Sequence, residues 1–109
     1  MAVGRGWLAL IDGGHYAESW RQASAYFQGM VTEPQWTGSL DGGRRPLGNL
    51  IARHLKKATP PSSLPGAPDG GYVVMEFETS FANKQHAVET VTFALDRDGT
   101  WRAAGYYIR

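Results

Sequence analysis

The sequence predicts an α+β domain in which N-terminal helices pack against a curved antiparallel sheet. Apolar side chains recur at helical spacing over roughly the first forty residues. From Tyr72 onward the apolar period changes to two, which is typical of strands with one buried face. A length of 109 residues with 42% apolar side chains suits one core, so we expect a single domain over residues 1–109.

Two of the helices are predicted before residue 30. The first contains Trp7, Leu8 and Ile11 and ends at Gly13-Gly14. The second begins at His15 and ends near Gly29, because its apolar residues recur on one stripe of a helix. The residues of this stripe are Tyr16, Trp20, Ala23 and Phe27. We expect them in the core, and we expect Trp36, Trp101 and Tyr26 there as well.

A third helix opens at Thr32, where Thr32 and Gln35 match a capping box, and ends at Gly42-Gly43. The stretch from Leu50 to Thr59 fits either a helical face or a strand. Residues 60–71 contain four prolines and three glycines, which excludes regular structure and predicts an ordered loop.

The strands that follow form a meander in which turn chemistry sets the register. A three-residue loop of Arg97-Asp98-Gly99 places Glu89 opposite Tyr107. A three-residue loop of Asn83-Lys84-Gln85 places Thr79 opposite Glu89. The apolar faces coincide only at this parity. Glu89 is therefore predicted on the buried face, between Thr79 and Tyr107.

Three segments resemble a family of small bacterial domains catalogued as domain of unknown function four-zero-one-nine. These segments are WLALIDGGHYAESW, SLPGAPDGGYVVMEFETSFANKQHAVETV and DGTWRAAGYYIR. The resemblance spans nearly the whole chain and implies an extended segment at ARHLKKAT, hence a first strand near Ala52 to Thr59. Helices followed by four strands are similar to cystatin-like and nuclear-transport-factor-two-like folds. The resemblance implies no activity, cofactor or catalytic residue, and members of the family usually look exported.

Glu89 is the one residue with a case for chemistry. Burial favours the neutral form of a carboxylic acid, so this side chain could exchange a proton near neutral pH. The competing interpretation is structural, with Glu89 held by the hydroxyl of Tyr107 or Thr79 or by an arginine. If the site binds a ligand, we expect Thr79, Glu89, Tyr107 and Trp101 to line it.

Composition excludes several other functions. The net charge of +1 gives no large electrostatic footprint for nucleic acid or an anionic membrane, and zero cysteines exclude thiolate sites. His15, His54 and His86 are too far apart in sequence to suggest a metal site. No apolar run is long enough to cross a bilayer. No secretory signal is evident, so we expect a periplasmic location if a leader was removed and a cytoplasmic one otherwise.

These observations favour a non-enzymatic binding or interaction module without a cofactor. It would enclose a small apolar ligand, or form a homodimer through the outer face of its sheet. The alternative is an isomerase-type or hydrolase-type enzyme with Glu89 as general base and Tyr107 as donor. A structural accessory domain is a third interpretation. The binding module leads because no second titratable group converges on Glu89.

Overall fold

The computed structural model describes residues 2–59 and 71–109, and it has the α+β architecture that the sequence predicts. The helices are α1 (Ala2–Asp12), α2 (Tyr16–Arg21), α3 (Ala25–Met30) and α4 (Glu33–Gly43), followed by the short 3-10 helix η1 (Arg45–Leu47). The strands are β1 (Leu50–Ala58), β2 (Tyr72–Phe81), β3 (Lys84–Leu95) and β4 (Trp101–Ile108). They form one antiparallel sheet in the order β1-β2-β3-β4. Nearly all of the predicted proline-rich loop lies outside the described residues.

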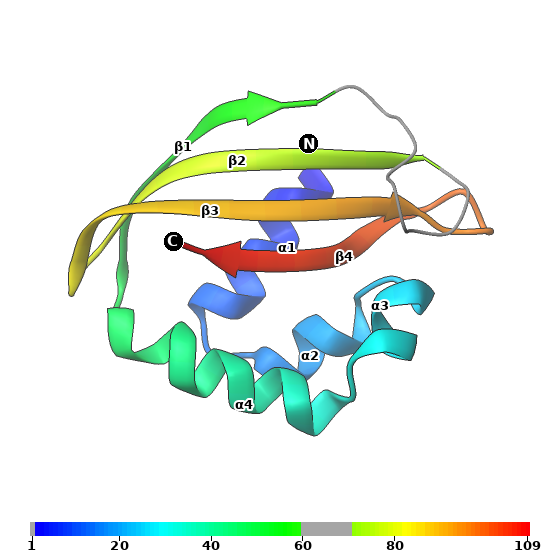
Figure 1. The fold of residues 1–109 in the computed structure, drawn as a ribbon, viewed down its shortest axis with the longest axis horizontal. Helices are drawn as coiled ribbons and strands as arrows, with labels where there is room; N and C mark the ends of the chain where they lie inside the picture. The colour runs from blue at the N-terminus through cyan, green and yellow to red at the C-terminus, as the bar shows by residue number, and fades with distance from the viewer. Residues whose placement is uncertain (1, 60–70) are drawn as a thin grey trace.

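The helices cover one face of the sheet and the edge formed by β4. In Figure 1, α1 passes behind the sheet, while α2, α3 and α4 lie along the side of β4. The strands bend at the end of the sheet that approaches η1, which gives the predicted curvature. The segment that could have been helix or strand is β1, as the family resemblance implied.

The second predicted helix is in fact two helices, α2 and α3, and Ser24 lies between them. Its hydroxyl accepts a hydrogen bond from the Phe27 backbone N–H at 3.1 Å, so it caps α3. Its own N–H donates to the carbonyl of Ala103 in β4 at 2.8 Å. A continuous helix would have used that N–H internally. The third predicted helix is confirmed as α4, since Thr32 and Gln35 form a capping box at its start.

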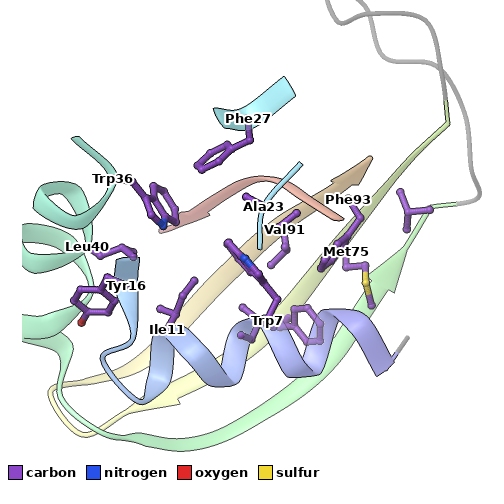
Figure 2. Packing of buried hydrophobic residues seen from close by; sticks show 14 residues of the cluster. Trp7, Ile11, Tyr16, Ala23, Phe27, Trp36, Leu40, Met75, Val91 and Phe93 are labelled. Carbon is purple, nitrogen blue, oxygen red and sulfur yellow. The ribbon is translucent and has the colours of Figure 1, made fainter. Parts of the chain in front are cut away.

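An aromatic cluster fills the space between the helices and the sheet (Figure 2). Trp36 stacks near Trp7 with ring centroids 6.2 Å apart and meets Phe27 edge-on at 4.9 Å. The indole N–H groups of Trp7 and Trp36 both donate to Ser19, at 2.9 Å each. Each indole is therefore satisfied within the core, where the sequence places Trp36.

The β2–β3 hairpin is two residues out of the predicted register. Ala82 and Asn83 make a two-residue turn that pairs Phe81 with Lys84. A bulge with one extra residue in β3 then shifts the pairing back by one, so that Phe77 rather than Thr79 lies opposite Glu89. The turn is held from outside the hairpin, because the Asn83 N–H donates to the Leu47 carbonyl at 2.8 Å. An offset of two residues leaves every side chain on its predicted face, and the inward orientation of Glu89 is preserved.

The pairing of β3 with β4 also differs from the prediction, and the difference exchanges the positions of two tyrosines. Phe93 pairs with Ala103 but Thr92 pairs with Gly105, so Ala104 is the extra residue of a β-bulge. Beyond the bulge the faces of β4 are reversed. Tyr106 packs against the core, while Tyr107 is 58% exposed. The prediction that Tyr107 faces Glu89 is therefore wrong.

Glycine 48 allows η1 and β1 to meet the hairpin turn. Gly48 has φ of +79°, and a Cβ there would lie 3.0 Å from the side-chain nitrogen Nδ2 of Asn83 and 3.1 Å from the Ala82 Cβ. Gly38, inside α4, has ordinary helical backbone and open space around its Cβ position. Glycine is therefore required by the backbone and by close neighbours at position 48, but not at position 38.

We expect Gly48→Ala to lower the free energy of unfolding by roughly 1–2 kcal/mol from left-handed backbone strain, with a further loss from crowding at the turn. Gly38→Ala should raise the same free energy by roughly 0.5–1 kcal/mol, because alanine loses less entropy in a helix. Urea denaturation followed by circular dichroism measures both changes. Equal effects of the two substitutions would contradict the assigned role of Gly48.

Candidate functional site

Glu89, on β3, is fully buried, which confirms that it points inward. Its Oε1 accepts hydrogen bonds from Arg53 Nε and Thr79 Oγ1, both at 2.6 Å. Its Oε2 accepts from Arg53 Nη2 at 3.0 Å and from the Tyr106 hydroxyl. A carboxylate offers about four acceptor positions. Donors from the described residues therefore fill the acceptor capacity of Glu89.

Arg53, on β1, joins this carboxylate to α1. Its Nη1 and Nη2 donate to the two oxygens of Asp12 at 2.8 and 3.0 Å. Burial alone would lower the pKa of Arg53, but the hydrogen bonds to Asp12 and Glu89 raise that pKa above its usual range. The guanidinium thus stays charged between two carboxylates, in a bidentate geometry that lysine could not reproduce.

Arg44 extends the same cluster to the end of α4. It is 3% exposed, and its Nη2 donates to Asp12 Oδ1 at 3.2 Å. Its guanidinium also lies 4.3 Å from the centre of the Phe81 ring. The cluster of Asp12, Arg44, Arg53 and Glu89 therefore holds two positive and two negative charges, together with the hydroxyls of Thr79 and Tyr106.

Tyr106 takes the position that the sequence assigned to Tyr107. Burial raises the pKa of Tyr106, and the neighbouring Glu89 carboxylate raises it further. The phenol therefore remains a hydrogen-bond donor across the physiological pH range. The ring meets Trp7 edge-on, with centroids 5.8 Å apart. The same side chain thus connects the carboxylate to the aromatic core.

Of the residues that the sequence proposed as a site, the structure brings Thr79 and Glu89 into contact and separates the others. Trp101 pairs with Leu95 at the far end of β4, whereas Ile108 is the strand partner of Glu89. Tyr107 points outward. Arg53 was anticipated only as an unspecified arginine. A glycine inside a strand often marks a bulge, so Gly105 was the signal in the sequence for the bulge. A bulge there would have predicted that Tyr106, rather than Tyr107, faces the core.

The predicted absence of a metal site rested on the three histidines. His15, His54 and His86 are all exposed. Within residues 2–59 and 71–109, no three side chains of the metal-binding types gather closely enough to hold an ion.

A small cleft adjoins the buried cluster, between α4 and β4. Its volume is about 170 Å³, and it borders the cluster at Arg44 and Tyr106. From α4 it is lined by residues at helical spacing, and from β4 by the last residues of the strand: Trp36, Ser39, Leu40, Gly43, Arg44, Tyr106, Tyr107 and Ile108. Apart from Arg44, these described lining residues carry no charge.

Two larger hollows have a more polar lining. One, of about 440 Å³, lies on the outer face of the sheet beside His54, Glu78, His86 and Arg109. The other, of about 380 Å³, lies between α1 and β1 beside Arg5, Asp12 and Arg53. The outer face is also where the sequence predicts a homodimer, and that interface stays a prediction.

The fold and the cluster define a small α+β domain with a buried, fully hydrogen-bonded carboxylate. A family model matches residues 3–106, and the chain belongs to that family, described as protein of unknown function (DUF4019). This confirms the family indicated by the sequence segments. No curated protein matches the chain in sequence. None of the helices in the described part of the chain combines the length and apolar character needed to cross a bilayer.

Tyr106→Phe and Tyr107→Phe form a matched pair that tests the β4 register. We expect Tyr106→Phe to lower the free energy of unfolding by about 1.5–3 kcal/mol, because it removes a donor from a buried carboxylate. Tyr107→Phe should change it by less than about 0.5 kcal/mol, because that hydroxyl is on the surface. Chemical denaturation of both variants provides the measurement. A larger loss at Tyr107 would contradict the bulge.

Proposed function

We propose that this domain is a non-enzymatic binding module whose cleft between α4 and β4 receives one small apolar group. The cleft volume of about 170 Å³ supports this proposal. An apolar cavity of roughly 150 Å³ is large enough to bind benzene. A single ring or a short branched chain therefore matches the space beside Trp36, Leu40 and Ile108.

The walls of the cleft are fixed before any ligand arrives. Trp36 is held by its hydrogen bond to Ser19 and by edge-on packing with Phe27. Tyr106 is held by its hydrogen bond to Glu89. Ordering of side chains on binding costs roughly 0.5–1.5 kcal/mol for each one immobilised. Walls that are already ordered avoid most of that cost, which favours binding in so small a space.

The hydrogen bonds of Glu89 weigh against the enzymatic alternative. A general base needs an accessible lone pair within hydrogen-bond reach of the substrate proton. Arg53, Thr79 and Tyr106 occupy the acceptor positions of Glu89, and the carboxylate has no exposed surface. A substrate would have to displace one of these donors. We therefore assign Glu89 to holding the cleft wall rather than to proton transfer.

Toluene tests this proposal, with two neighbouring glycines as matched sites. Gly43 lines the cleft and Gly42 does not, and both are exposed. Apart from chain neighbours and the backbone of α4, neither has a heavy atom within 4 Å of its Cβ position. Leucine at either position should add about 1 kcal/mol of helix propensity. We expect toluene to shift the amide NMR signals of the cleft residues in the wild type and in Gly42→Leu. Gly43→Leu fills the cleft and should abolish these shifts.

A wild-type protein whose cleft signals do not respond to toluene would contradict a ligand site here. Equal binding by the two leucine variants would also contradict it, since the ligand would then lie elsewhere. Circular dichroism of both variants confirms that each retains the fold.

A further inference from the structure

We propose that the ligand of the α4–β4 cleft is a small monocarboxylate, whose apolar part occupies the cleft and whose carboxylate binds Arg44. This inference rests on the proposed binding function and adds the chemical class of the ligand. Its starting point is a buried guanidinium whose Nε has no hydrogen-bond partner among the described residues.

Four features hold the Arg44 side chain in place. Its Nη1 donates to the Gly48 carbonyl at 2.7 Å, and its Nη2 donates to Asp12 at 3.2 Å. The guanidinium plane packs on Phe81. The side chain is only 4% exposed. Arg44 is therefore an ordered cation, and the direction of its Nε–H is fixed.

The guanidinium nitrogen of Arg44 that has no partner is Nε. It is buried and makes no hydrogen bond to any residue among 2–59 and 71–109. Buried polar groups are paired in the great majority of cases, so an unpaired one calls for a partner. Arg44 lines the cleft, and an acceptor atom of a bound ligand would supply that partner. The same residue thus links the orphan donor to the space for a ligand.

The charge around the cleft favours an anionic acceptor. Arg44 carries the single charge among the described residues that line it, and that charge is positive. The last carbonyls of α4 give this end of the helix a partial negative charge of about half a unit. The Arg44 guanidinium is paired with Asp12 at 3.2 Å, but as a lining residue it can donate directly to a bound anion. Hydrogen bonds between a guanidinium and a carboxylate are also stronger than neutral ones.

One carboxylate fits this site better than a phosphate. A phosphate presents three acceptor oxygens and nearly two negative charges. The cleft offers a single guanidinium, of which Nε is the one nitrogen without a hydrogen bond to a described residue, beside the apolar surfaces of Trp36, Leu40 and Ile108. The extra oxygens of a phosphate would lose hydration without gaining partners. A ring or short chain bearing a single carboxylate leaves fewer polar atoms unsatisfied.

Benzoate and nitrobenzene provide the test, because they have nearly the same shape and differ in charge. We expect benzoate to bind the wild-type domain at least about tenfold more tightly than nitrobenzene, the factor that about 1.4 kcal/mol produces. The NMR signal of the Arg44 Nε–H should shift with benzoate and not with nitrobenzene. Equal affinities would overturn the inference, and are the result expected if Nε only holds an ordered water.

Arg44→Lys and Arg45→Lys provide matched variants. Arg45 is the exposed neighbour of Arg44, paired with Asp41, and it is not among the cleft residues. Arg44→Lys keeps the charge but removes Nε, so it should reduce benzoate affinity at least about tenfold and leave nitrobenzene affinity nearly unchanged. Arg45→Lys should change neither. A benzoate affinity unaffected by Arg44→Lys would overturn the inference.

The outcomes separate this inference from the function on which it rests. If nitrobenzene and benzoate bind with equal affinity, the apolar site is supported and the inference that the ligand carries a carboxylate is rejected. If neither compound binds, the proposed ligand site in the cleft is rejected as well. If Arg44→Lys does not fold, the wild-type affinity ratio and the Nε–H signal decide the inference without it.

Discussion

The fold depends on the burial of one carboxylate together with its donors. Glu89 lies at the centre of the sheet, and its partners come from β1, β2 and β4, while Arg53 continues to Asp12 in α1. Removing one partner of a buried ion pair typically costs about 3–5 kcal/mol, because it leaves the other charge unpaired. The sheet order and the position of α1 are thus tied to one set of hydrogen bonds, made by residues far apart in sequence.

This arrangement determines which polar groups of the cluster a ligand could contact. Donors fill the acceptor positions of Glu89 at the centre of the cluster, which supports the proposed binding function over proton transfer at this residue. At the rim, Tyr106 and Arg44 face the cleft beside α4, and Arg44 retains an unused donor. In the function that we propose, the saturated carboxylate holds the cleft wall and the rim of the network contacts the ligand. The rigidity of the network keeps the donor in place.

The sequence predicts the fold class and the orientation of Glu89, because strand parity survives a register error of two residues. Of the partners of Glu89 it predicts Thr79, but it does not identify Arg53 or Tyr106. Arg53 lies on a strand that periodicity could not distinguish from a helix, and Tyr106 depends on a bulge at Ala104. Ser24 breaks the second helix because its N–H bonds to Ala103, a contact with another part of the chain. Each of these features is a long-range contact, which local patterns do not encode.

A double-mutant cycle on Arg53→Met and Glu89→Gln tests the central claim most directly. The exposed pair Arg21 and Glu18 serves as a control, and we expect its two substitutions to be additive. Urea denaturation of the single and double variants gives the coupling free energy. The account predicts a coupling of about 1–3 kcal/mol between Arg53 and Glu89. Additive effects, with a coupling below about 0.5 kcal/mol, would contradict it.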